Sequence, residues 1–240
     1  MGRIALVTGV GKDTGIGFDL CRRLAARGET VWLTARKPGA SEALTARLPE
    51  GRTHAATLDV TDPAAIAALR ERVERVSGGL DILINNAAGV APWGETAAGA
   101  DLGAAGAVID TTLFGAWAMA QAFLPLLRRS PAGRLVMVSS GAGSHGDPVF
   151  GLTTGNGMGT SYAVAKAALN ALTVKLAREE TTPTVRINAV CPGFTATFEG
   201  GAAMGARPVA GGAASILWAI DFPNDGPTGG FFRDGKPLPW

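Results

Sequence analysis

The sequence predicts a Rossmann-like α/β domain, a doubly wound parallel sheet with helices on both of its faces. Short runs of β-branched and apolar residues alternate with longer Ala-, Leu- and Arg-rich segments of helical period almost to the end of the 240-residue chain. Because parallel strands need crossover connections, this rhythm indicates repeated strand–helix units in a sheet of about seven strands. No internal repeat or linker interrupts the rhythm, so residues 1–240 are expected to form a single domain.

Short apolar segments are the expected strands. Their β-branched content favours strands that are buried on both faces, as in a parallel sheet. They are residues 4–8, 30–34, 55–58, 82–84, 134–139, 185–190 and 230–232. Ligands of such a sheet bind beyond the carboxyl ends of its strands, so the residues that follow each strand are the candidates for a binding site.

The segments between these strands carry the amphipathic spacing of helices. The clearest are residues 16–27, 63–76, 103–127 and 161–179. Asp62 before Pro63 makes a natural N-cap and first-turn pair. The longest polar loop, residues 144–159, lies where a binding crevice would open.

Composition and charge exclude several classes of protein. The 22 Lys and Arg against 20 Asp and Glu leave no excess positive charge for nucleic acid or an anionic membrane surface. Cys21 and Cys191 are far apart and have no thiol or His cluster beside them, so neither a disulfide framework nor a metal site is expected. Apolar runs such as residues 4–7 are far shorter than the ~20 residues of a bilayer crossing, and no signal-peptide pattern opens the chain. A cytoplasmic protein is therefore expected.

A glycine-rich turn follows the first expected strand and predicts a dinucleotide site. Residues 8–17 read TGVGKDTGIG. A pyrophosphate binds the backbone N–H groups at a helix N-terminus, and each missing Cβ lets the main chain approach the phosphates. The alternative is a glycine-lined turn without a ligand. The candidate contacts are Gly9, Lys12, Gly15, Ile16 and Gly17.

The end of the second expected strand favours NADP(H) over NAD(H). An acidic residue is expected there when the ribose 2′-hydroxyl is bound, but the chain has Arg36 and Lys37. The Arg36 guanidinium can bind a 2′-phosphate with two hydrogen bonds, and Lys12 can add a second positive charge. The alternative is that both are solvated surface cations.

Tyr162 and Lys166 are the candidate acid–base pair. Tyr162 is the only tyrosine and stands one helical turn before Lys166, so both side chains project from the same helix face. An ordinary phenol, with a pKa near ~10, is a poor acid–base group at neutral pH, and an adjacent ammonium lowers that pKa. Ser140, directly after the expected strand 134–139, offers a hydroxyl that could hold a developing alkoxide. The alternatives are a helical Tyr with a snorkelling Lys, and an ordinary turn serine.

Several motifs occur together in an order that is typical of one enzyme family. They are the glycine turn, Asn85-Asn86-Ala87, Ser140, Tyr162-x-x-x-Lys166 and Pro192-Gly193-x-x-x-Thr197. In these residues, over essentially the whole chain, the sequence resembles the short-chain dehydrogenase/reductase family. The tail 229–240 and Thr34-Ala35-Arg36 are similar to its carbonyl reductase branch.

The resemblance implies a role for each matching residue. Tyr162 would be the proton donor and acceptor, Lys166 would lower its pKa and hold the nicotinamide ribose, and Ser140 would orient the substrate carbonyl. The other implied cofactor contacts are Asp59 and Val60 at the adenine, Asn86 and Ala87 beside the cofactor, and Pro192, Gly193, Thr195 and Thr197 at the carboxamide. The family commonly associates through helices that correspond to residues 103–127 and 161–179, so a homodimer or homotetramer is expected.

Three features depart from the family pattern, the mildest being Gly89, which stands one place late after Asn85-Asn86-Ala87-Ala88. The glycine turn has two more residues between Gly9 and Gly15 than most reductases of the family, which leaves its phosphate contacts open. Enoyl reductases resemble this turn, but they place their Tyr and Lys further apart and lack the serine. Thr112 stands where the family usually has an Asn that holds a relay water. Because a Thr offers one rotating O–H, a slower or rerouted proton relay is expected.

The substrate wall is expected on two loops. His145, Phe150 and Met158 lie on the loop 144–159, and Trp93 lies beyond the fourth expected strand. Apolar and aromatic side chains suit a hydrophobic carbonyl compound. The alternative is that these are ordinary loop residues, with His145 on the surface.

The predicted reaction is the reversible, NADPH-dependent reduction of a ketone or aldehyde to an alcohol. The nicotinamide supplies the hydride and Tyr162 the proton, while Ser140 holds the substrate oxygen. The expected partner is a small-molecule carbonyl substrate, not a nucleic acid or a membrane. Two alternatives stay open: an enoyl reductase, and a non-catalytic scaffold that senses NADP(H).

Overall fold

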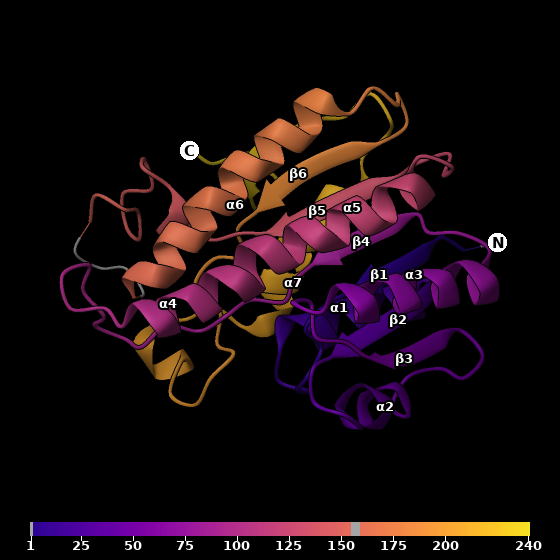
Figure 1. Cartoon of the computed structure of the whole chain (residues 1–240), viewed down its shortest axis with the longest axis horizontal. Helices are drawn as coiled ribbons and strands as arrows, with labels where there is room; N and C mark the ends of the chain where they lie inside the picture. The colour runs from indigo at the N-terminus through magenta and orange to yellow at the C-terminus, as the bar shows by residue number, and fades with distance from the viewer. Residues whose placement is uncertain (1, 155–158) are drawn as a thin grey trace.

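The computed structural model describes residues 2–154 and 159–240 of the chain (Figure 1). One eight-stranded sheet, in the order β3-β2-β1-β4-β5-β6-β7-β8, forms its centre. Its strands are β1 (Ile4–Val7), β2 (Thr30–Ala35), β3 (Thr53–Thr57), β4 (Ile82–Asn85), β5 (Arg134–Val138), β6 (Arg186–Val190), β7 (Phe231–Arg233) and β8 (Lys236–Pro237). All pairings are parallel except that of β7 with β8. This architecture confirms the predicted doubly wound α/β class.

The helices lie between the strands, as the alternation predicts. They are α1 (Ile16–Ala26), α2 (Ala40–Thr45), α3 (Pro63–Ser77), α4 (Leu102–Ile109), α5 (Gly115–Leu127), α6 (Thr160–Glu179) and α7 (Val209–Asp221). The sequence analysis missed α2, α7 and the short strand β8. The expected single helix 103–127 is two α-helices joined by a π-helical turn, Asp110–Phe114.

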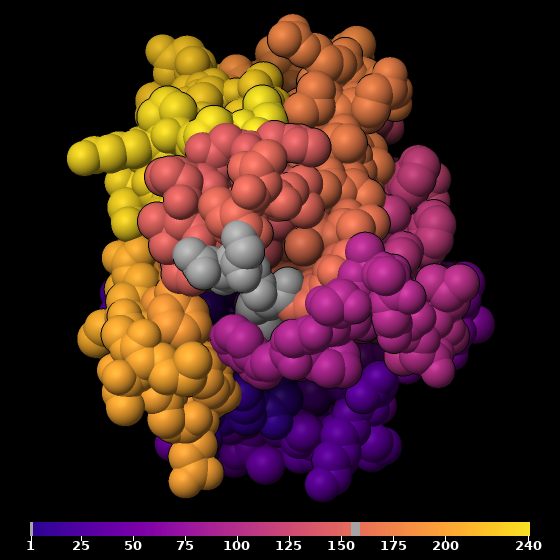
Figure 2. Space-filling view, turned by 90° about the vertical axis from the view of Figure 1, so that its left-hand side faces the viewer, coloured from indigo at the N-terminus to yellow at the C-terminus, as the bar shows by residue number. Residues whose placement is uncertain are grey.

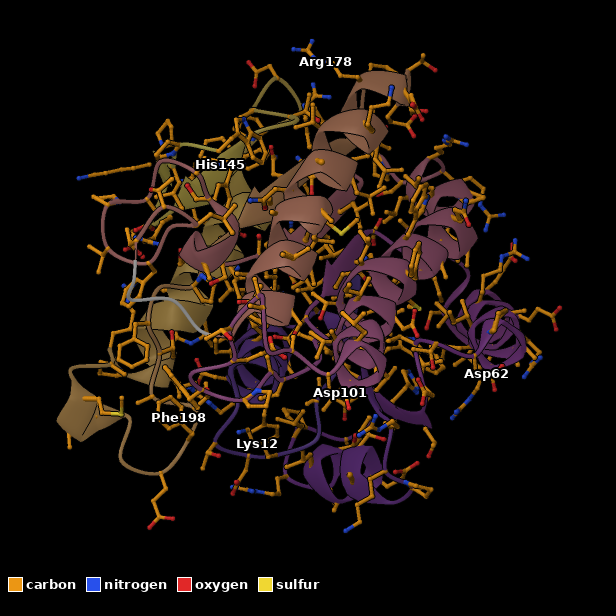
Figure 3. The ribbon with its side chains drawn as sticks, turned by 60° about the vertical axis from the view of Figure 1, so that its left-hand side comes forward. Lys12, Asp62, Asp101, His145, Arg178 and Phe198 are labelled. Carbon is orange, nitrogen blue, oxygen red and sulfur yellow. The ribbon has the colours of Figure 1, made fainter. Side chains whose placement is uncertain are left out.

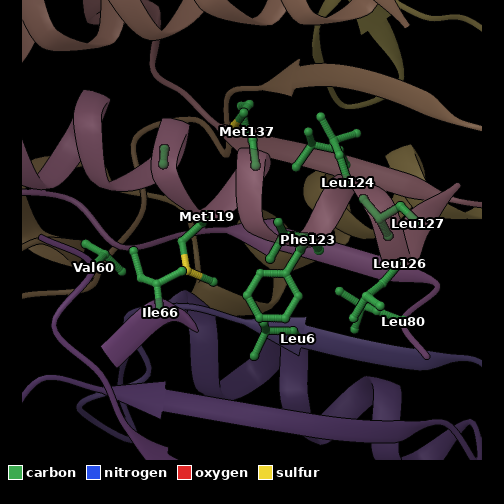
Figure 4. Packing of buried hydrophobic residues seen from close by; sticks show 14 of the residues in the cluster. Leu6, Val60, Ile66, Leu80, Met119, Phe123, Leu124, Leu126, Leu127 and Met137 are labelled. Atoms are coloured by element: carbon green, nitrogen blue, oxygen red, sulfur yellow. The ribbon is translucent and has the colours of Figure 1, made fainter. Parts of the chain in front are cut away.

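Adjacent residues of the central strands point to opposite faces of the sheet, so each strand serves two cores. On one face Leu6 packs with Met119 and Phe123 of α5 beneath α3, α5 and α6, and Figure 4 shows Phe123 beside Leu6. On the other face Val7 packs with α1 and α7. Figure 1 shows α3, α5 and α6 across the near face of the sheet.

The helical stretch Leu102–Leu127 is long and apolar enough to cross a membrane by length and composition alone. Its Met119, Phe123 and Leu127 are fully buried, however, in the core between the sheet and the neighbouring helices. This is the packing of a core helix.

Candidate active site

The β1–α1 turn forms a cradle because its glycines leave room for neighbouring main chain. Gly9 has a positive φ of 73°, and a Cβ there would lie 2.7 Å from the Cα of Ala87. A Cβ on Gly17 would lie 2.9 Å from the amide nitrogen of Asn86. The turn therefore packs directly against the residues that follow β4, and larger side chains would separate the two segments.

A cleft of about 740 Å³ opens above this turn. Turn and strand-end residues predicted to bind the cofactor line it: Gly9, Lys12, Gly15, Ile16, Gly17, Arg36, Asp59, Val60, Asn86, Ala87 and Thr197. Its volume falls in the range of cofactor sites, and the glycine cradle at the start of α1 exposes main chain to it. The residues present therefore fit a dinucleotide. Figure 2 looks at this end of the molecule, where segment 191–208 (orange) and segment 90–104 (purple) border a hollow with N-terminal residues (indigo) at its floor.

Arg36 is exposed at the end of β2, at the rim of the cleft. Hydrogen bonds from Thr61, with a smaller contribution from the Arg36 charge, hold the pKa of Asp59 below its usual value. Among the ion pairs of the described residues, none includes Arg36. Its guanidinium is thus available at the position predicted for a 2′-phosphate.

Lys12 lines the same cleft as Arg36 but already has a hydrogen-bond partner. Its ammonium donates a hydrogen bond to the carbonyl oxygen of Thr197, which lies on the far side of the cleft, in the loop between β6 and α7. The neighbouring Asp13 forms an ion pair of 2.9 Å with Arg47. The Lys12 side chain of the lengthened turn therefore spans the cleft. The sequence analysis did not predict this contact with Thr197.

Ser140, Tyr162 and Lys166 come together from β5 and α6. Ser140 follows β5 and accepts a hydrogen bond from the Ala142 amide at 3.2 Å, which starts a short 3₁₀ turn. A Cβ on Gly143 would lie 2.5 Å from the backbone of α6 at Lys166, so only a glycine lets this turn pack so close to the helix.

The protonation states of Tyr162 and Lys166 follow from burial. Burial raises the pKa of Tyr162 to about 12, although a hydrogen bond with Ser140 acts in the opposite direction. Burial also lowers the pKa of Lys166 to about 8. The Lys166 ammonium lies 5.5 Å from the centre of the Tyr162 ring and donates a 2.6 Å hydrogen bond to the Val138 carbonyl. In the protein alone, burial therefore outweighs the expected lowering of the phenol pKa by Lys166, and at neutral pH Tyr162 carries its proton.

Thr112 lies in the π-helical turn and is fully buried. Its hydroxyl oxygen accepts a 2.9 Å hydrogen bond from the Gly89 amide. Nearby, Asn85 donates to the Ala116 carbonyl at 3.1 Å. Thr112 thus holds the segment after β4 against the helix, and the neighbouring Thr111 lines the cleft in its place.

The β6–α7 loop carries the residues predicted to contact the carboxamide. The Thr195 hydroxyl donates to the carbonyl oxygens of Pro192 and Gly193, at 3.2 and 3.0 Å. A Cβ on Gly212 would lie 2.7 Å from that hydroxyl, so α7 packs tightly on the loop. Of the predicted residues in this loop, Thr197 reaches the lining of the cleft.

Four aromatic side chains form a row at the carboxyl-terminal edge of the sheet. Trp93 packs on Phe198 with ring centres 5.8 Å apart, Phe198 on Phe194 at 6.2 Å, and Phe194 on Phe150 at 5.7 Å. Three loops beyond the carboxyl ends of β4, β5 and β6 supply these rings. The sequence analysis named Trp93 and Phe150 but missed Phe194 and Phe198, although both lie in the loop singled out for the cofactor.

The other two predicted substrate residues do not join the aromatic row. His145 is exposed, and its amide donates to the Trp240 carbonyl at 2.9 Å. Figure 3 shows His145 well apart from Phe198 and Lys12. The expectation that His145 belongs to the substrate wall is therefore not met, because its backbone is bonded to the C-terminal residue and its side chain is exposed. Met158 lies outside the described residues.

Comparison with known proteins agrees with this geometry. Residues 3–203 match the family model of the short chain dehydrogenases. The chain belongs to the short-chain dehydrogenase family. It is therefore an oxidoreductase of a family that uses a nicotinamide cofactor.

Relatives of this short-chain dehydrogenase include several named reductases. It is 33% identical over 207 residues to the 3-oxoacyl-[acyl-carrier-protein] reductase of Escherichia coli, covering 82% of this chain and 75% of that protein. It is 31% identical to (+)-neomenthol dehydrogenase of Capsicum annuum, covering 96% and 95%. Among solved structures, NADPH-bound carbonyl reductase from chicken fatty liver has a TM-score of 0.84 at 29% identity, covering 100% and 99%.

Proposed function

We propose that this short-chain dehydrogenase reduces a ketone or an aldehyde to the alcohol with NADPH. The observation that carries the proposal is the arrangement of Tyr162, which keeps its proton at neutral pH, with the Ser140 hydroxyl close enough to lower its pKa and the buried Lys166 ammonium 5.5 Å from its ring. A protonated phenol is a proton donor, which is what carbonyl reduction requires of the protein.

The reaction divides between the cofactor and the protein. When bound, the reduced nicotinamide supplies the hydride that the carbonyl carbon accepts. Ser140 holds the carbonyl oxygen by a hydrogen bond, and Tyr162 gives this oxygen its proton as negative charge develops there. The Lys166 ammonium, 5.5 Å from the ring, then stabilises the phenolate that remains. The same groups run in reverse for alcohol oxidation.

Arg36 supports NADPH as the cofactor. It lies at the rim of the cleft, beyond the end of β2, where a fork of N–H donors can bind a 2′-phosphate. The chicken carbonyl reductase, whose solved structure contains NADPH, has the same fold over the whole chain.

The aromatic row supports a hydrophobic, uncharged substrate. Four tilted rings from the loops beyond the carboxyl ends of β4, β5 and β6 present apolar faces, and such faces bind planar or alicyclic ketones better than charged ones.

The test is a carbonyl panel with purified protein, including acetophenone, benzaldehyde and cyclohexanone, with NADPH or NADH consumption followed by absorbance. Cyclohex-2-enone separates the enzymatic alternatives, because carbonyl reduction yields cyclohex-2-enol and an enoyl reductase yields cyclohexanone. We expect the allylic alcohol and a preference for NADPH. Tight NADPH binding without turnover of any compound would instead favour the cofactor-sensing scaffold, and production of cyclohexanone the enoyl reductase.

A further inference from the structure

The sulfur of Cys191 is the centre of a buried group of N–H donors behind the catalytic trio. Cys191 follows β6 and is 3% exposed. Its Sγ accepts hydrogen bonds from the Gly141 amide at 3.2 Å, the Gly193 amide at 3.3 Å, and the Arg233 guanidinium at 3.2 and 3.4 Å. One atom thus joins the turn that follows Ser140 to the loop predicted to hold the nicotinamide.

The same guanidinium reaches a third segment. Arg233, at the end of β7, donates to the Asp147 carboxylate at 2.5 Å, and the Asp147 side chain is 0% exposed. The other carboxylate oxygen accepts the Val149 and Phe150 amides at 2.9 and 3.0 Å. Through Asp147, Arg233 is therefore connected to the loop that places Phe150 in the aromatic row.

The atoms around Cys191, Asp147 and Arg233 are tightly packed. A Cβ on Gly141 would collide with both the Asp147 carboxylate and the Arg233 guanidinium. These two side chains therefore lie directly against the residue that follows Ser140. We call Gly141, Asp147, Cys191, Gly193 and Arg233 the Cys191 cluster.

Stability alone does not explain why such a cluster is built from charges. Burying an ion pair costs desolvation free energy, and well-packed apolar residues of similar volume often stabilise a protein as well or better. What the hydrogen-bonded charges of Arg233, whose side chain is 25% exposed, and the fully buried Asp147 add is a fixed geometry. Here the geometry that they hold is that of three active-site segments.

The geometry points to Arg233 as a positioning residue for the proposed carbonyl reduction: through Cys191 and Asp147 it holds Ser140, the Gly193 loop and Phe150 in register. The inference rests on the proposed function for its kinetic part. Its structural part, the holding of the three segments, does not.

The experiment compares Arg233→Ala and Arg233→Lys with Arg128→Ala. Arg128 pairs at 3.0 Å with Glu180, whose side chain is 3% exposed, at the ends of α5 and α6. It is a matched control because it also bonds a nearly buried carboxylate but lies away from the trio. With NADPH and the best carbonyl of the panel, we expect kcat of Arg233→Ala to fall about ten- to a hundredfold, as for a small misplacement of reacting groups. The Kd of NADPH should change little, and millimolar guanidinium should restore part of kcat in Arg233→Ala but not in the wild type.

Hydrogen–deuterium exchange gives a readout besides activity. Peptides that cover residues 140–151 and 191–194 should exchange faster in Arg233→Ala and be unaltered in Arg128→Ala. Unchanged exchange in these peptides would overturn the inference, as would an unchanged kcat or a kcat loss that follows the loss of thermal stability equally in both variants. Should Arg233→Ala fail to fold, Arg233→Lys carries the same measurements. An inactive wild type would overturn the proposed function instead, and the exchange data would still decide whether Arg233 holds the loops.

Discussion

The ammonium of Lys166 lies 5.5 Å from the centre of the Tyr162 ring, one turn further along the same face of α6. Burial leaves the phenol with a pKa of about 12 and the ammonium with a pKa of about 8. The pair is therefore ready to give a proton to a substrate oxygen, with a positive charge in place to stabilise the resulting phenolate.

Tyr162→Phe removes this proton and little else. Turnover of the best carbonyl should fall by about two to four orders of magnitude, the range for a positioned general acid. NADPH affinity, measured by fluorescence titration, should stay close to that of the wild type because the ring remains. Full activity of the variant would show that another group protonates the substrate.

Arg36→Ser should weaken NADPH binding and spare NADH. A charge-assisted hydrogen bond contributes about 1.5–3 kcal/mol, so the Kd of NADPH should rise roughly ten- to a hundredfold. Titration with both cofactors measures the change, and Lys37→Ser, at the next exposed residue, is the control. Equal effects on both cofactors would show that Arg36 does not read the 2′-phosphate.

Lys12→Met removes the hydrogen bond that crosses the cleft to Thr197. An exposed hydrogen bond contributes about 0.5–1.5 kcal/mol, so NADPH should dissociate a few times faster. Stopped-flow displacement measures this rate, and Lys175→Met, on the exposed surface of α6, is the control. An unchanged rate would mean that the contact has no part in retaining the cofactor.

The strands and the longer helices could be predicted from the sequence, because each depends on the pattern of a short run of neighbouring residues. All the expected strands are present within two residues of their predicted ends, because each is a compact apolar run. The helix α7 was not predicted because Gly211 and Gly212 interrupt its helical pattern of apolar residues. A Cβ at these two positions would clash with the side chains of Arg207 and Thr195. The two-residue strand β8 is too short for any periodicity, although Asp234-Gly235 before it is a hairpin signal.

In the site, too, residues placed by local motif spacing were predicted, and contacts between distant segments were not. Motif spacing placed Tyr162, Lys166 and Ser140 correctly on α6 and after β5, since those positions follow from local order. The Cys191 cluster joins residues from three distant parts of the chain, so no window of sequence could reveal it. The direction of the Lys12 side chain also depends on Thr197, 185 residues further along the chain.

Thr112→Val should destabilise the protein, because it leaves the partly buried Gly89 amide without an acceptor. The expected loss is about 1–3 kcal/mol in the free energy of unfolding, measured by urea denaturation. Thr112→Ser keeps the hydroxyl and should lose much less. Thr112→Asn tests the relay: unchanged kinetic constants would show that this position takes no part in it.

Protonation of Asp147 at low pH should lower the free energy of unfolding of the protein. Burial alone would raise the pKa of Asp147, but the Phe150 and Val149 amides and Arg233 outweigh it and hold the pKa below its usual 3.8. The unfolded chain then takes up this proton at higher pH than the folded one, so the contribution is complete above pH 3.8 and is lost as the pH falls further. In urea titrations from neutral pH to below about pH 4, Asp147→Asn should lose less stability than the wild type. Asp225→Asn, in an exposed turn, should keep the full acid dependence.

The π-helical turn Asp110–Phe114 makes α4 and α5 two helices whose frames differ by one residue. Deleting one residue there would restore a continuous α-helix and rotate all that follows by about 100°. Gly115, where a Cβ would lie 2.6 Å from the Val60 side chain, would then lose its place against Val60, which lines the cofactor cleft. One extra residue in a helical turn thus lets a single segment serve both the buried core, through Met119 and Phe123, and the rim of a nucleotide site, through Ala104 and Val108.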